Sequence, residues 1–175
     1  MKIMRTDILA GPSEQWRNGL LAGLAGGAAE VVWIAIYSGL TGVSASSVAG
    51  GVTATLMPAE AGTAMAVPIG LVIHFGLAAM LGLAVAVFLR NAVPQLAGSL
   101  AEVGLITTVL GAVWALNFLL VLPLINPDFV HVVPMSVSFI SKILFGLAAA
   151  TVFKVRVAKD ARIVSQYSNK DTNYV

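Results

Sequence analysis

Four long, mostly apolar segments dominate the sequence and leave few folds open to it. They cover residues 18–40, 66–89, 102–124 and 134–155. A helix needs roughly 20 apolar residues to cross the hydrocarbon core of a bilayer, which is about 30 Å thick. Only 10% of the 175 residues are charged, whereas a soluble domain carries about 25%. The sequence therefore predicts an all-α integral membrane protein with four transmembrane helices.

The distribution of lysine and arginine orients these segments. Of the 10 basic residues, Lys142 alone lies well inside a segment. The others precede the first segment, separate the second from the third, or close and follow the fourth: Lys2, Arg5, Arg17, Arg90, Lys154, Arg156, Lys159, Arg162 and Lys170. Cytoplasmic loops carry the excess of basic residues. We therefore expect both termini to be cytoplasmic and the protein to lie in a bacterial inner (plasma) membrane.

Three parts of the chain follow from this topology. They are a cytoplasmic N-terminal segment (residues 1–17), a four-helix transmembrane domain (residues 18–155) and a polar cytoplasmic tail (residues 156–175). The tail mixes charges of both signs with polar residues and lacks long apolar runs. Such a composition favours a solvated and partly disordered segment over residues 159–175.

A long outer loop of small residues, 41–65, joins the first two transmembrane helices. Within it, Val48, Val52 and Leu56 recur every four residues. This spacing favours a short helix in the outer interface or a re-entrant turn against the bundle. A flexible loop is the open alternative.

Small residues repeat every four positions along three of the segments. Gly19, Gly23 and Gly27 form such a stripe in the first segment, and Gly82 and Gly146 belong to comparable stripes in the second and fourth. In lipid, small residues let helix backbones approach closely. We expect these five glycines to form helix-packing contacts of the glycine-zipper type.

Each of these three stripes also includes one ionisable residue, namely Glu30, His74 or Lys142. At a rise of about 1.5 Å per residue, Glu30 lies about 18 Å and Lys142 about 19–20 Å from the cytoplasmic ends of their segments. A charge near the membrane centre costs at least about 2.5–3.5 kcal/mol. Opposite charges at matching depth therefore predict a buried Glu30–Lys142 ion pair.

A polar column toward the outer face would extend this pair. The candidate binding or relay residues are Glu30, Lys142, His74, Asn117, Tyr37 and Ser138. The pair has two open interpretations: a structural clamp, or an ion, proton or anionic-substrate site reached along this column. His74 is either a core histidine that hydrogen-bonds to Tyr37, Ser38 or Asn117, or part of a proton relay.

The sequence shows no motif for catalysis, metal binding or a cofactor. Without cysteine there is no disulfide, iron–sulfur cluster or thiolate site. The weaker alternatives are haem between His74 and His131, Cu(I) at methionines of the outer face, and a dyad of Lys142 with Ser138 or Ser141. We expect no catalytic residue, no metal and no cofactor, and no nucleic-acid partner because the cations form no patch interleaved with aromatic residues.

Two functions fit these features. The leading hypothesis is a small polytopic protein that acts as a structural or accessory component, with the Glu30–Lys142 pair buried. The alternative is a small-solute or proton-coupled transporter that uses the same polar cluster. Four short helices scarcely enclose a pathway alone, so we expect, besides the lipid bilayer, a homo-oligomer or a larger membrane complex as partner.

Overall fold

The computed structural model describes residues 12–172, and every regular element in this range is helical. Four helices are long and apolar enough to cross a membrane: Glu14–Thr41, Ala66–Ala92, Leu100–Ile125 and Met135–Lys159. They coincide closely with the four predicted segments, which confirms an all-helical chain with four helices of this kind. Most of the predicted N-terminal segment, up to residue 11, lies outside the described residues.

The first half of the chain forms two long helices with a shorter one between them. Helix α1 (Pro12–Thr41) ends where Gly42 adopts a φ of 78°, a left-handed conformation that favours glycine. Ser44 then caps α2 (Ala45–Leu56), because its hydroxyl accepts the Ser47 N–H at 3.4 Å. A 3₁₀ turn, η1 (Pro58–Glu60), leads to α3 (Ala66–Ala92).

A short 3₁₀ turn, η2 (Pro94–Leu96), connects α3 to α4 (Leu100–Leu116). Ser99 caps α4, because its Oγ accepts the Glu102 N–H at 3.1 Å. Glu102 Oε2 in turn accepts the N–H of Gly98, the residue before the cap, at 2.7 Å. Gly98 has a φ of 74°, the second position where the backbone favours glycine.

Helix α4 continues without a break into a π-helical turn, η3 (Asn117–Val121), and then α5 (Leu122–Ile125). Pro123, within α5, has no N–H to donate to the helical ladder, so a local widening at this point is expected. Helix α6 (Phe129–Val132) then leads to α7 (Met135–Thr172).

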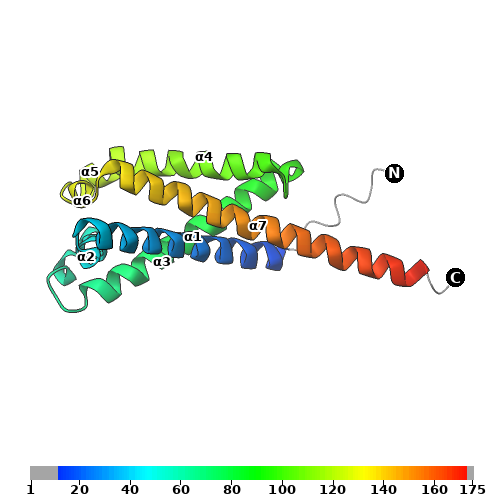
Figure 1. Cartoon of the computed structure of the whole chain (residues 1–175), viewed down its shortest axis with the longest axis horizontal. Coiled ribbons are helices and arrows are strands. Elements are labelled where there is room, and N and C mark those ends of the chain that lie inside the picture. The colour runs from blue at the N-terminus through cyan, green and yellow to red at the C-terminus, as the bar shows by residue number, and fades with distance from the viewer. Residues whose placement is uncertain (1–11, 173–175) are drawn as a thin grey trace.

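The four long helices follow the spatial order α3, α1, α7, α4. Helix α1 packs against α3 and α7, and α4 packs mainly against α7 (Figure 1). One buried core takes side chains from all four: Ala22, Ala78, Val85, Ala86, Leu89, Ile106, Leu110, Phe145, Ala149, Ala150 and Phe153. We call the end of the bundle that holds α2, α5 and α6 the α2 end, and the opposite end, where α1 begins and α7 extends beyond its neighbours, the tail end.

The contact between α1 and α3 depends on residues without a side chain or with a single methyl group. A Cβ at Gly23 would collide with the backbone of Ala78, and one at Gly82 would collide with Gly19 and Gly23. At Gly19 a Cβ would lie 2.9 Å from the Ala86 methyl group. The two backbones therefore approach so closely that larger residues do not fit, as in close helix pairs in lipid.

Helix α2 packs against α3 and the connection between α4 and α7. The buried Thr53 hydroxyl donates to the Ala66 carbonyl at 2.5 Å. From the other side, Asn126 Nδ2 donates to the Gly51 carbonyl at 3.2 Å and to Thr55 Oγ1 at 2.9 Å. These bonds fix α2 across the α2 end of the bundle.

Helix α7 continues through the polar tail as far as Thr172. The prediction of partial disorder is therefore wrong for residues 159–172. This stretch contains neither glycine nor proline and includes several good helix formers, such as Lys159 and Arg162. The low apolar content of this stretch suggested disorder. It does not prevent α7 from continuing as a helix beyond the part that packs against its neighbours.

We expect Gly23→Ala to destabilise the protein. The added methyl group would meet the Ala78 backbone, and overpacking of this kind costs about 1–3 kcal/mol. The matched control is Gly76→Ala on α3, where a Cβ would meet nothing within 4 Å and the gain in helix propensity is at most about 1 kcal/mol. Thermal unfolding in detergent compares them, and equal stabilisation by both substitutions would contradict the close contact.

Candidate functional site

A buried ion pair joins α1 to α7. Lys142 Nζ lies 2.9 Å from Glu30 Oε1, and the two side chains are 18% and 10% exposed. The Ser141 hydroxyl donates to the same carboxylate oxygen at 3.0 Å. The predicted ion pair is thus confirmed, and one oxygen of Glu30 receives two donors from successive residues of α7.

An aromatic ring covers the ammonium group of Lys142. The Phe145 ring centroid lies 4.9 Å from Nζ, within the range of a cation–π contact. Phe145 is only 1% exposed. A Cβ at Gly26 would lie about 2.5 Å from this ring, so the absence of a side chain at Gly26 makes room for it. Gly26 thereby supports the ion pair. The sequence pattern did not reveal this role, because Gly26 does not belong to the stripe of Gly19, Gly23 and Gly27.

Glu30 does not face the same neighbour as the glycine stripe that precedes it. Gly19 and Gly23 contact α3, whereas Glu30 bonds to residues of α7. On α7, a Cβ at Gly146 would approach Thr107 of α4 at 3.1 Å, while Lys142 reaches back to α1. The expectation of one face for the glycines and the charge is therefore wrong. Residues three or four apart differ enough in direction to reach different neighbours, and the Lys142 side chain is long.

His74 joins α3 to α1. Its Nε2 lies 3.0 Å from the Gly27 carbonyl oxygen, so Nε2 carries the proton and donates it. A Cβ at Gly27 would lie 3.4 Å from this nitrogen, which explains why the ring can approach the backbone here. The partner is a backbone carbonyl, and not the side chain of Tyr37, Ser38 or Asn117.

Two tryptophans add bonds between helices. Trp33 Nε1 donates to the Val137 carbonyl at 3.0 Å, which links α1 to α7. Trp114 Nε1 donates to Ser138 Oγ at 3.1 Å, and Ser138 in turn donates to the Met135 carbonyl at 2.9 Å. Ser138, a predicted relay residue, thus links α7 to α4 and is not hydrogen-bonded to the ion pair.

The predicted polar column is not continuous. No hydrogen bond among the described residues joins Asn117 or the Tyr37 hydroxyl to Glu30, Lys142 or His74. Asn117 begins the π-helical turn, and its side chain is exposed. The structure thus groups Glu30, Lys142 and Ser141, and it places His74 and Ser138 at separate contacts. Within the described residues, the Asn117 amide and the Tyr37 hydroxyl form no side-chain hydrogen bond.

Two open grooves lie on the seam between α1 and α7. Their lining includes Leu24 and Val155 in one and Val32 and Leu147 in the other, and neither is lined by the ion pair. Among the described residues, no three of His, Asp and Glu are placed together as metal ligands. Comparison of the chain with protein-family models, curated proteins and solved structures gave no match.

The ion pair predicts a characteristic double-mutant cycle. Lys142→Met leaves the Glu30 carboxylate buried without its counter-charge, and Glu30→Gln does the same to Lys142. Each is expected to lower the free energy of unfolding by about 3–5 kcal/mol. The double variant should lose clearly less than the sum, because neutral side chains need no counter-charge.

Ser141→Ala is the matched control for this cycle. It removes one hydrogen bond to the carboxylate and leaves both charges, so it should lower the stability less, by about 1.5–3 kcal/mol. Unfolding in mixed detergent micelles measures all four variants. Additive losses for Glu30 and Lys142 would show that the two side chains do not interact in the folded protein.

Proposed function

We propose that this chain is an integral protein of a bacterial inner membrane, with both termini cytoplasmic, and that it acts as a structural or accessory component of a membrane assembly. The tail end is then the cytoplasmic end and the α2 end the outer one. The Glu30–Lys142 pair serves as a clamp between α1 and α7 in this proposal.

The use of polar side chains within the four long helices supports the clamp. The Glu30–Lys142 pair and Trp33 join α1 to α7, His74 joins α3 to α1, and Trp114 joins α4 to α7. These are the neighbouring pairs in the packing order of the helices. Hydrogen bonds across helices are a recognised means of association in lipid, so these polar groups already have a role within the fold.

The accessory role rests on one observation, the exposed amide of Asn117. It lies about 25 Å along the helix from Leu100, which places it within a hydrocarbon core about 30 Å thick. Leu116, Leu119 and Leu120 around it are also exposed, by 56%, 57% and 55%. An amide without a partner in an apolar environment is costly, by several kcal/mol. A second membrane protein chain against this face of α4 would supply the missing hydrogen bonds.

A small-solute or proton-coupled transporter is the second candidate. The depth of Glu30 and Lys142 favours it, because ionisable groups at mid-membrane commonly mark ion or substrate paths. The two candidates differ in the variant that carries both Glu30→Gln and Lys142→Met. A clamp predicts that assembly and function survive together, whereas a transporter predicts normal assembly with loss of function.

We expect Asn117→Leu to release the partner. The protein, purified in mild detergent from its native membrane, should have a mass well above the 18.1 kDa of one chain, and Asn117→Leu should shift it to lower mass because the amide is lost. Asn117→Gln keeps an amide and is the control. Native mass spectrometry gives the readout. A wild-type protein that occurs only as a single free chain would contradict the accessory role.

The absence of cysteine allows a direct test of orientation. Ala64 lies in the connection between η1 and α3, at the α2 end, and Gln95 lies in η2, which joins α3 to α4 at the tail end. Both residues are exposed, and each is replaced by cysteine in turn. A membrane-impermeant maleimide should label Ala64→Cys on intact cells from which an outer membrane, if present, has been removed. It should label Gln95→Cys only after lysis, because the basic tail end stays in the cytoplasm. The reverse pattern would contradict the proposed orientation.

A further inference from the structure

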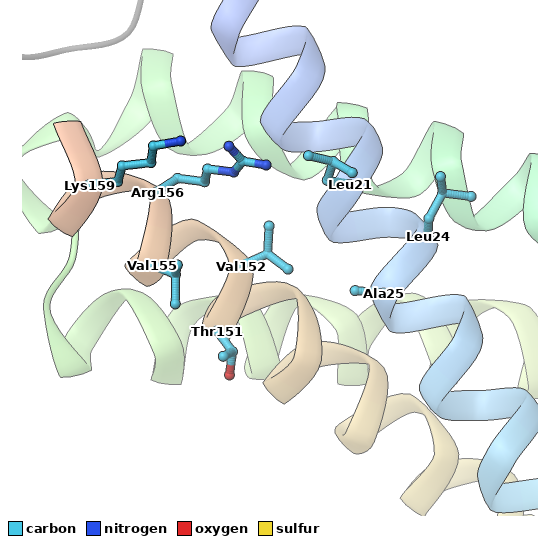
Figure 2. Close-up of a pocket in the computed structure, with 8 residues that line it drawn as sticks. All are labelled: Leu21, Leu24, Ala25, Thr151, Val152, Val155, Arg156 and Lys159. Carbon is cyan, nitrogen blue, oxygen red and sulfur yellow. The ribbon is translucent and has the colours of Figure 1, made fainter.

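An open groove of about 690 Å³ runs between α1 and α7 near the tail end (Figure 2). Its walls are mostly apolar and include Leu21, Leu24 and Ala25 of α1 and Val152 and Val155 of α7. Thr151 also lines it, but its hydroxyl already donates to the Leu147 carbonyl at 2.8 Å. A second groove of about 380 Å³, which Thr151 also lines, continues along the same seam toward the α2 end.

Two cations stand at the tail end of this groove. Arg156 and Lys159 are three residues apart on α7, and Figure 2 shows their side chains extending side by side toward Leu21. Like charges on neighbouring turns repel each other. Neither Arg156 nor Lys159 forms an ion pair with any carboxylate side chain that the structure describes.

The position of these cations along α7 matches the edge of a bilayer. Arg156 is 14 residues beyond Lys142 in the sequence, or about 21 Å along the helix axis. Half of the hydrocarbon core is about 15 Å thick. With the Glu30–Lys142 pair near mid-membrane, the apolar part of the groove lies at the depth of one leaflet, and Arg156 lies at the level of the headgroups. The backbone of Lys159 lies about one turn further out.

We propose that this groove binds one anionic phospholipid. Its phosphate would contact Arg156 and Lys159, and one acyl chain would lie between α1 and α7 along Leu24, Ala25 and Val152. Arginine binds phosphate oxygens in a forked geometry, and lysine adds a point charge. Basic pockets between transmembrane helices on the cytoplasmic side are suited to anionic headgroups. The proposal rests on the membrane setting proposed above, but not on the accessory role.

A second copy of the chain fits the groove less well. Two copies in the same orientation, related by an axis along the membrane normal, place equivalent residues at the same depth. Contact across this groove would then bring the Arg156 and Lys159 side chains of both copies together, which adds like charges to a pair that already repels. An anionic lipid neutralises these charges, and its chain fills the apolar part.

Native mass spectrometry of the full-length protein in nonionic detergent tests the proposal. Dioleoylphosphatidylglycerol is the anionic probe and dioleoylphosphatidylcholine the neutral one. We expect the anionic lipid to bind at one molecule per chain and more tightly than the neutral lipid. Each cation near a membrane surface contributes about fivefold to attraction, so the R156Q/K159Q variant should bind the anionic lipid up to about thirtyfold more weakly.

Two further variants make the result specific. K154Q/R162Q removes the same charge from cations of α7 that do not line the groove, and it should bind the anionic lipid clearly better than R156Q/K159Q does. Ala25→Phe fills the groove without a change in charge and should also weaken binding. Thermal unfolding without lipid verifies that each variant is folded.

Four results would overturn the proposal. Equal binding of the two lipids would remove the role of the headgroup charge. Equal losses in the two double variants would indicate diffuse attraction and not a site. Glycerol phosphate that displaces the lipid at equal concentration would show a site for a small anion without a chain. A doubled protein mass with no bound lipid would show that a second copy covers the groove. Because bound lipid is counted on the isolated chain, these outcomes are independent of whether a partner contacts Asn117.

Discussion

A carboxylate and an ammonium group that meet 2.9 Å apart hold α1 and α7 together, and several neighbouring residues are explained by that contact. In hydrocarbon neither charge is tolerated well alone. Ser141 adds a second donor to the same oxygen of Glu30, and the Phe145 ring lies against the ammonium group. The ring fits because Gly26 has no side chain. Ser141, Phe145 and Gly26 thus either contact the ion pair or make space for it.

The contact of α1 with α3, on the other side of the helix, depends on close packing and not on charge. On the side toward α3, Gly19, Gly23 and Gly27 of α1 pack against Ala78, Gly82 and Ala86 of α3. This contact depends on close approach of two backbones, and His74 adds one bond to the Gly27 carbonyl. Helix α1 therefore has a polar attachment on one side and a close-packed one on the other. This combination places α1 between α3 and α7, while α4 packs mainly against α7.

The sequence was sufficient for the four membrane-length helices and for the ion pair. Apolar length determines the helices, and the matching depths of Glu30 and Lys142 follow from the helical rise. The sequence did not predict which helix packs against each face of α1 and α7, because a stripe of small residues does not identify the helix that it contacts. Trp33 and His74 donate hydrogen bonds to backbone carbonyls. Because every residue has a backbone carbonyl, the sequence does not identify these acceptors. The helical tail was missed because its composition, not its continuity with a packed helix, guided the prediction.

The most direct test of this account is a solid-state NMR measurement of the dipolar coupling between ¹⁵Nζ of lysine and ¹³Cδ of glutamate in protein reconstituted into lipid bilayers. The Lys142→Met and Glu30→Gln variants assign the signal. Direct contact of the two charged groups within the membrane predicts a strong coupling that disappears in either variant. A spectrum without this coupling, from protein that is folded and spans the bilayer, would contradict it.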